Sequence, residues 1–382
     1  PLTATAERLV ELGHEPVFAV RAPALALKHW GDRRFALLAA PLPPGTTRVA
    51  SDFVTYVDVL WNECGFHDAQ RLTSCWAAWR GLIETVAPRL LLVDGAPVAI
   101  AACRGLPIVR VASGNAFPNP PAAPWPPFRT WGSVDARHVP AREAAALDHA
   151  NAAAAFVGSP ALATLDDVFE AEERVLTTLP ELDLYGERDD VEYVGPAIAV
   201  GHAAPPRWPD GSGPRVFAYV KRDHPFRDRL LGALARLADA RVALYLDGER
   251  PTLPAHVAVH DTLVDVPAAL AQCDAVVSAG GANVAGAALL AGKPQLVTPI
   301  HAEQYNTGLA LQRAGAGLAV TPPFDRPDYL APLKRLLAEP AFRTAAERVA
   351  ARHAGTLDVA GGAARLAERC HAALGRRETR PA

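Results

Sequence analysis

A glycine pair and a later cluster of polar side chains are the residues of this sequence best suited to chemistry. Gly280 and Gly281 follow an apolar run that ends at Ser278, and a small-residue segment with helical character begins near Ala282. Such a turn exposes backbone N–H groups at a helix N-terminus, where a phosphate can approach closely because glycine has no Cβ atom. An ordinary turn between a strand and a helix is the alternative explanation of a Gly-Gly pair.

The polar cluster follows the next apolar run, which ends at Pro299. Its members are His301, Glu303, Gln304 and Asn306. A carboxylate beside an amide can form paired hydrogen bonds with the hydroxyl groups of a sugar. Because ligands of parallel sheets bind beyond the carboxyl ends of the strands, the two groups of residues predict one site for a phosphate and a sugar.

The segment from 274 to 308 resembles the signature region of the UDP-glycosyltransferase superfamily. The family pattern is His-Gly-Gly-x-Gly-Thr-x-x-Glu-Ala-Leu, then Gly-x-Pro, then Asp/Glu-Gln and Asn. The sequence matches it without a gap at Gly280, Gly281, Ala288, Leu289, Gly292, Pro294, Glu303, Gln304 and Asn306. The resemblance implies a hexosyltransferase that inverts configuration, needs no metal and takes its hexose from a nucleotide diphosphate sugar, expected to be UDP-linked. It also implies that Glu303 and Gln304 hold the donor sugar.

Three places in this pattern have lost the family's residues. They are Ala279 for the phosphate-binding His, Asn283-Val284 for Gly-Thr, and Ala287 for the ribose-binding Glu. Losing a charge-assisted phosphate contact costs about 1.5 to 3 kcal/mol. Asn283 is a candidate to replace one polar contact, and Lys221 or Arg222 is a candidate for the missing cation. For both cations, a solvated surface charge is the alternative.

The resemblance extends upstream, where residues 176–196 are similar to the family's approach to the interdomain linker. The stretch VHDTLVDVPAALAQCDAVVS is similar to the approach to the donor loop. This similarity implies that Thr262 to Val266, with Val264 at the centre, face the nucleotide base.

The catalytic base is expected outside the numbered sequence. An inverting transfer needs a base to deprotonate the acceptor hydroxyl, and in this family the base is a histidine oriented by an aspartate. The resemblance matches Pro1 to the proline of the family's Gly-His-x-x-Pro loop, so the histidine and the strand before it would precede Pro1. Asp94, which ends the run LLLVD, is the expected orienting partner. A helix N-cap is the alternative role for Asp94.

Candidates for the acceptor side come from a Pro-rich aromatic segment, residues 114–132, and from one histidine. They are His67, Trp125, Phe128 and Trp131. Aromatic residues in such a loop either line a pocket or anchor the loop by packing, and the sequence leaves both open. The acceptor is therefore predicted only as a small or lipophilic molecule.

The elements that must position these residues alternate between short apolar runs and helical patterns. Runs at 17–20, 90–93 and 108–112, and then at 216–220, 242–246, 256–259, 275–278 and 295–298, are apolar throughout, as strands of a covered parallel sheet must be. The alternation predicts two doubly wound, Rossmann-like α/β domains in tandem, which is the GT-B architecture of the resembling family. We expect an acceptor domain over 1–200 without its first strand, a linker over 201–214, a nucleotide-sugar domain over 215–358, and a C-terminal helix and tail over 359–382.

Composition excludes several other classes of protein. The 382 residues carry a formal net charge of −3 with 21% charged side chains, which does not suit a protein that coats nucleic acid. No apolar run reaches the roughly 20 residues of a membrane-spanning helix, although peripheral membrane contact and a lipid acceptor remain open. Five scattered cysteines without a CxxC pair favour a reducing cytoplasm and predict no metal site. No cofactor is expected beyond the sugar nucleotide as co-substrate.

Two alternative functions remain open at this point. A catalytically impaired GT-B protein that binds a nucleotide or a partner without turnover is suggested by Ala279 and Ala287. A sugar-nucleotide epimerase is the second alternative, because such enzymes can share this scaffold. The sequence predicts no oligomeric state.

Overall fold

The computed structural model describes residues 2–30, 34–43, 53–114, 124–129, 131–132, 134–198, 203–248, 251–320 and 327–378. The chain forms two compact units. The N-terminal unit contains Thr5–Leu176, Arg188–Glu192 and Leu366–Ala382, and the C-terminal unit contains Pro1–Ala4, Thr177–Glu187 and Tyr193–Arg365. The first boundary lies near residue 177, earlier than the predicted 200, because Leu179 and Leu182 are buried in the core of the C-terminal unit.

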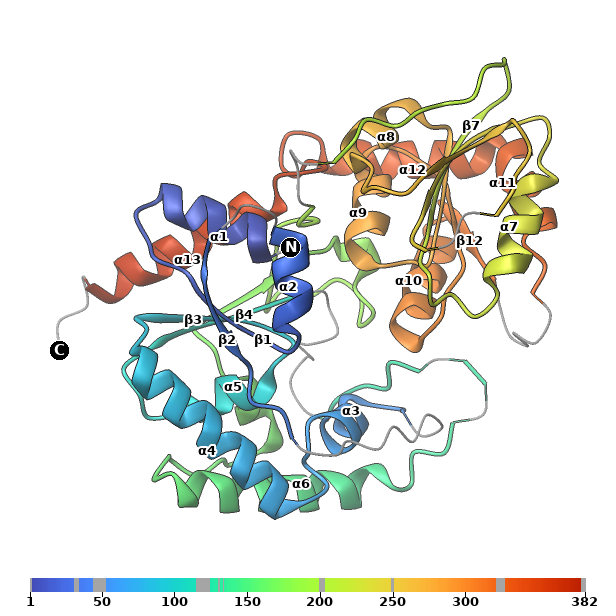
Figure 1. Cartoon of the computed structure of the whole chain (residues 1–382). Coiled ribbons are helices and arrows are strands. Elements are labelled where there is room, and N and C mark those ends of the chain that lie inside the picture. The colour runs from blue at the N-terminus through green and yellow to red at the C-terminus, as the bar shows by residue number, and fades with distance from the viewer. Residues whose placement is uncertain are drawn as a thin grey trace. The chain divides into compact units, whose positions relative to one another are not determined.

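The N-terminal unit contains a parallel pair of strands and a four-stranded sheet (Figure 1). The pair is β1 (Val17–Val20) and β2 (Ala36–Ala39), and the sheet has the order β3 (Leu90–Asp94), β4 (Val109–Gly114), β5 (Glu173–Leu176) and β6 (Glu192–Tyr193). The predicted runs at 17–20, 90–93 and 108–112 are therefore strands. The strand expected upstream of Pro1 stays a prediction.

Helices of the N-terminal unit pack through apolar and small side chains. They are α2 (Pro23–Trp30), α3 (Tyr56–Glu63), α4 (Ala69–Val86), α5 (Pro97–Ala102), α6 (Val139–Phe156), the 3-10 helix η1 (Leu165–Phe169), and the parts of α1 (Leu2–Glu11) from Thr5 and of α13 (Gly362–Glu378) from Leu366. Helix α4 begins where Asp68 accepts a hydrogen bond from the Arg71 N–H. It packs against α6, on which Ala146, Ala150 and Ala153 are fully buried and allow close approach.

The C-terminal unit contains one six-stranded parallel sheet in the order β12-β11-β10-β7-β8-β9. Its strands are β7 (Arg215–Val220), β8 (Arg241–Leu246), β9 (Val257–His260), β10 (Ala275–Ser278), β11 (Gln295–Val297) and β12 (Gly317–Ala319). Its helices are α7 (Arg227–Ala235), α8 (Val266–Gln272), α9 (Ala282–Leu290), α10 (Ala302–Arg313), α11 (Leu330–Ala338), α12 (Pro340–His353) and the 3-10 turn η2 (Pro180–Leu182). All five strands predicted here are present.

Both faces of this sheet are covered, as the continuous apolar runs predict. Along β7, Val216 and Ala218 join one buried cluster, whereas Phe217 joins another on the opposite face. The strand order reverses between β7 and β10, and a ligand of such a sheet binds beyond the carboxyl ends of the strands at this point. The sequence did not predict β12, because three residues that begin with a glycine form no recognisable apolar run.

Candidate functional site

The turn that joins β10 to α9 requires glycine at one position and leaves open space at the next. Gly280 has a φ of +87°, and a Cβ atom there would lie 2.5 Å from Val297 Cγ1 and 3.0 Å from the Gln304 carbonyl oxygen. Gly281 is the N-cap of α9, and a Cβ atom added to it would meet no atom within 4 Å. The turn therefore leaves room at a helix N-terminus, as phosphate binding needs.

The polar cluster lies at the start of α10, directly beside this turn. A Cβ atom on Gly280 would lie 3.0 Å from the Gln304 carbonyl oxygen, so the turn and the start of α10 lie side by side. The Gln304 side chain is 5% exposed, and its Oε1 accepts a hydrogen bond of 2.9 Å from the Ile300 N–H. The side-chain oxygen Oε1 of Gln304 thus holds the preceding loop, and the side-chain nitrogen Nε2 is the group that can donate to a ligand. Glu303 is half-buried in the first turn of α10.

The altered positions of the motif have structural consequences. Asn283 Oδ1 accepts a hydrogen bond of 2.7 Å from the Ala197 N–H, so it ties the 194–198 segment to the start of α9. Its Nδ2 is the part that a ligand could use. Ala287 is fully buried in the core cluster that contains Phe217 and Val276, which leaves no solvent-facing position for a carboxylate. Ala279, at 9% exposure, borders the turn itself.

The structure separates the two candidate cations after β7. Tyr219 of β7 pairs with Ser278 of β10, and these two strands meet where the strand order of the sheet reverses. Lys221 and Gly280 each come two residues after this pair. Lys221 is exposed. The Arg222 side chain lies over Gly248, which follows β8, and its Cγ would be 3.2 Å from a Cβ atom added to that glycine.

Val264 has a buried side chain. It is 4% exposed and belongs to the core cluster that contains Tyr245 and Ile198, while its backbone forms a parallel bridge with Ala204. Its neighbour Leu263 is 47% exposed. The buried Val264 side chain is therefore not open to a nucleotide base. That Val264 faces a base stays a prediction, and only its backbone and the exposed Leu263 are placed to meet one.

Asp94, in the N-terminal unit, is at the carboxyl end of β3. It does not cap the following helix, because the N-cap of α5 is Ala96. The side chain keeps an exposed face, yet desolvation by the surrounding protein raises the pKa of its carboxyl group above the ordinary value. Asp94 is thus a carboxylate held at a strand end without a capping role.

Of the aromatic candidates that the structure describes, Trp125 and Phe128 are buried and Trp131 is half-buried. Trp125 and Phe128 are 6% and 1% exposed, and Trp125 meets the rings of Tyr56 and Phe169 edge to face. The rest of the predicted loop at 115–123 and residue 130 lie outside the described residues. His67 Nδ1 is 2.8 Å from the Trp61 carbonyl oxygen, so one of its nitrogens is used within the protein.

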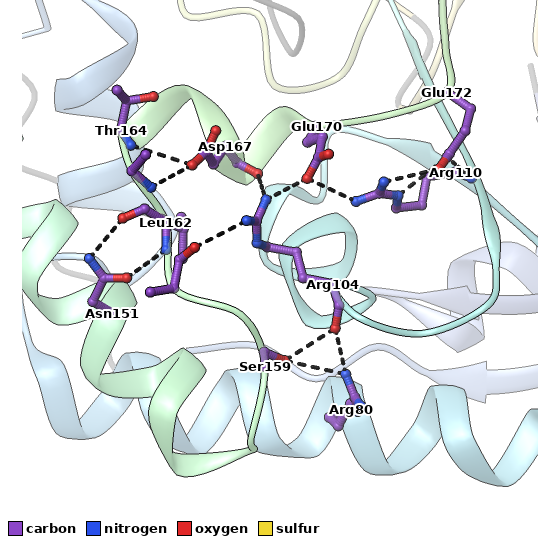
Figure 2. Close-up of polar contacts among 12 residues, drawn as sticks. Arg80, Arg104, Arg110, Asn151, Ser159, Leu162, Thr164, Asp167, Glu170 and Glu172 are labelled. Carbon is purple, nitrogen blue, oxygen red and sulfur yellow. Dashed lines mark hydrogen bonds and ion pairs between the residues drawn. The ribbon is translucent and has the colours of Figure 1, made fainter.

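An arginine network holds the 3-10 helix η1, which carries Phe169. Figure 2 shows Arg104 at its centre, with its guanidinium group directed toward Asp167 and Glu170. This group donates to the carbonyl oxygens of Ala161 at 3.2 Å and Asp167 at 3.3 Å and pairs with Glu170. Arg110 binds Glu172 in the same network. These bonds fix the segment against which Trp125 packs.

Comparison with known proteins identifies the fold. Residues 228–360 match the family described as Erythromycin biosynthesis protein CIII-like, C-terminal domain. A segment of 98 residues is 42% identical to the elloramycin glycosyltransferase ElmGT of Streptomyces olivaceus, and it spans 26% of this chain and 24% of that relative. The solved glycotransferase of kitacinnamycin covers 97% of this chain and 95% of its own at a TM-score of 0.67 and 21% identity. The chain has the GT-B fold.

Two further GT-B structures extend this similarity. The glycosyltransferase VinC, solved in complex with DTDP, covers 98% of this chain and 96% of its own with a TM-score of 0.65 and 19% identity. The glycosyltransferase SsfS6 of Streptomyces sp. SF2575, complexed with thymidine diphosphate, covers 97% and 95% with a TM-score of 0.63 and 17% identity. At these identities the likeness shows the fold, which agrees with the predicted pair of Rossmann-like domains.

Three buried polar residues beside the Gly280 turn form contacts that the sequence did not reveal. His224, Ser278 and Thr298 are 6%, 3% and 1% exposed, and each stands at or just beyond the end of a strand of the C-terminal sheet. Their place at strand ends is the signal that could have identified them, because ligands of GT-B and related sheets bind there.

The cysteines of this GT-B chain behave as apolar side chains. All five are free, four are buried, and burial raises the pKa of each thiol to about 11 or 12. Across the part of the chain that the structure describes, no group of three or more His, Cys, Asp or Glu residues could hold a metal ion. None of the described helices is long and apolar enough to cross a membrane.

Proposed function

We propose that this chain is a glycosyltransferase that moves a hexose from a nucleotide diphosphate sugar to a small or lipophilic acceptor with inversion. The observation that carries the proposal is the close approach of Gly280 to the Gln304 backbone, because it puts a helix N-terminus suited to phosphate beside the polar start of α10. Backbone N–H groups near Gly281 would hold the diphosphate, and Glu303 with the Gln304 amide would hold the sugar.

The nucleotides and acceptors to be tested follow from the sequence resemblance and from the ligands of the similar structures. The sequence resemblance favours a UDP-sugar, whereas VinC and SsfS6 were solved with thymidine diphosphates, so both nucleotides belong in the test. The spinosyn rhamnosyltransferase SpnG, solved with spinosyn aglycone, supports trying lipophilic aglycones as acceptors. We propose that Asp94 orients the histidine base expected upstream of Pro1 and that transfer proceeds in the cytoplasm without a metal or further cofactor.

The test is a transfer assay on the full chain, including any residues before Pro1, with dTDP- and UDP-hexoses and a panel of aglycones. Mass spectrometry should find a glycosylated acceptor and free nucleoside diphosphate in equal amounts, with no loss of rate in EDTA. Nucleotide binding without turnover across the panel would instead support the impaired GT-B protein that Ala279 and Ala287 suggest. Interconversion of the free sugar nucleotide without an acceptor would identify an epimerase.

A further inference from the structure

His224 is a buried imidazole in a loop that is mostly exposed and ends at the half-buried Phe226. The loop at residues 221–226 follows β7, and Lys221, Arg222 and Asp223 are exposed, whereas His224 is only 6% exposed. Burying an imidazole is unfavourable unless its polar nitrogens find partners. The burial therefore indicates that this side chain holds the loop in place.

Both ring nitrogens of His224 are used within the protein. Nε2 is 3.2 Å from the Thr298 carbonyl oxygen, and Nδ1 is 3.2 Å from the Phe226 backbone nitrogen. Since a carbonyl group can only accept and an N–H can only donate, the ring is the neutral tautomer that is protonated at Nε2. Desolvation lowers the pKa of His224 and favours this neutral form. The Tyr329 ring packs edge-on against the imidazole at 6.2 Å.

The bond to Thr298 continues to the donor turn. The Thr298 N–H donates to the Ser278 carbonyl oxygen at 2.8 Å, and Ser278 Oγ accepts from the Gly280 N–H at 3.2 Å. A run of hydrogen bonds thus connects the loop after β7, the end of β11 and the turn after β10. His224 determines where the loop stands with respect to the Gly280 turn.

The loop held in this way presents Lys221 at the donor edge. The register of β7 with β10 places Tyr219 beside Ser278, so the chain reaches Lys221 and Gly280 two residues later on neighbouring strands. Lys221 is exposed and has no ion-pair partner among the residues that the structure describes, while the Arg222 stem packs over Gly248 on the β8 side. An ammonium group next to a helix N-terminus adds to its attraction for phosphate.

We propose that His224 is a positioning residue that holds the 221–226 loop so that Lys221 contacts the donor diphosphate. Lys221 then supplies the charge that the family's histidine, here Ala279, no longer provides. This inference rests on the proposed function, because it requires a nucleotide diphosphate at the Gly280 turn.

The experiment is a double-mutant cycle in which calorimetry measures dTDP binding to the full chain. We expect His224→Ala and Lys221→Met each to weaken dTDP binding about tenfold, as loss of one charge-assisted hydrogen bond predicts. The double variant should bind no more weakly than Lys221→Met alone, because His224 acts through the lysine. Arg222→Met is the matched control and should retain wild-type affinity. His224→Gln, whose amide can still donate to Thr298, should recover part of the affinity and serves as the second variant if His224→Ala does not fold.

A second measurement separates positioning from general destabilisation. In hydrogen exchange of the unliganded chain, His224→Ala should speed exchange at the backbone N–H of Phe226, whereas Lys221→Met should leave it unchanged. Two results would overturn the inference when the wild type binds dTDP. One is that His224→Ala leaves the dTDP affinity unchanged, and the other is that it weakens dTDP binding as much in the Lys221→Met variant as in the wild type. If the wild type binds neither dTDP nor UDP, the proposed function fails, and this inference fails with it.

Discussion

At the scale of single residues, the turn between β10 and α9 combines one position where only glycine fits with one that is open. Gly280 is constrained both by its left-handed φ and by Val297 and Gln304, which surround it. The sequence motif predicted that the glycine pair forms a turn and that the polar residues at 301–306 lie near it. It did not distinguish the two glycines, because the close approach of Val297 depends on how β11 packs beside β10.

Substitution of the two glycines should therefore have unequal effects. Gly280→Ala must adopt a positive φ, which costs about 1 to 3 kcal/mol, and the clash with Val297 adds to this. Gly281→Ala is the matched control, and it should cost roughly 1 kcal/mol or less as a poorer N-cap. Urea denaturation of both variants measures the free energies of unfolding. Equal losses in the two variants would contradict this account of the turn.

The two lost polar positions of the motif should respond differently to restoration. Ala279→His places a donor at the edge of the turn and should tighten dTDP binding about tenfold, since a hydrogen bond to a charged group contributes about 1.5 to 3 kcal/mol. Ala287→Glu puts a carboxylate into a fully buried core position and should destabilise the fold by several kcal/mol. Calorimetry with dTDP and thermal unfolding of each variant distinguish these outcomes. A stable Ala287→Glu variant with tighter binding would show that position 287 faces the ligand.

At the scale of elements, the parallel sheet of the C-terminal unit was predictable except for β12, because its other strands are continuous apolar runs. The long-range hydrogen bonds were not predictable. Asn283 was expected to contact a ligand, yet its carbonyl oxygen binds Ala197, a residue far away in the sequence. His224 was not expected to have any role, because nothing in the sequence shows that its partner is the Thr298 carbonyl group.

The arginine network around η1 makes a prediction about the N-terminal unit. Arg104 is 11% exposed and holds two carbonyl groups and Glu170, so Arg104→Ala should lower the free energy of unfolding by about 2 kcal/mol. Arg137→Ala is the control, because Arg137 is 91% exposed and solvent screens its ion pair with Asp135. Chemical denaturation measures both changes. A loss for Arg104→Ala no larger than that of the control would show that the network does not stabilise this segment.

At the scale of the whole molecule, the two units contain histidines with the same kind of pKa shift. Desolvation lowers the pKa of His14 in the N-terminal unit and of His224 and His260 in the C-terminal unit. The proximity of His371, whose Nδ1 is 2.9 Å from His14 Nε2, lowers the pKa of His14 further.

Stability should therefore decrease as the pH falls below the ordinary histidine pKa of about 6.5. A histidine with a lowered pKa in the folded state binds fewer protons there than in the unfolded state, so protons favour unfolding in the window just below that value. Above it the group is neutral in both states and the penalty disappears. Denaturant titrations at pH 7.5 and pH 5.5 should show a smaller free energy of unfolding at pH 5.5, and His14→Gln should reduce the difference. Equal stability at both pH values would contradict the assigned burial.

The central claim is that the nucleotide diphosphate binds where the turn after β10 meets the start of α10. Hydrogen exchange of the full chain, with and without saturating dTDP or UDP, tests it most directly. The account predicts slower exchange at residues 279–284 and 300–306 and little change along β8 and β9. Protection confined to other segments, or none at nucleotide concentrations that saturate binding, would contradict the assignment of the donor site.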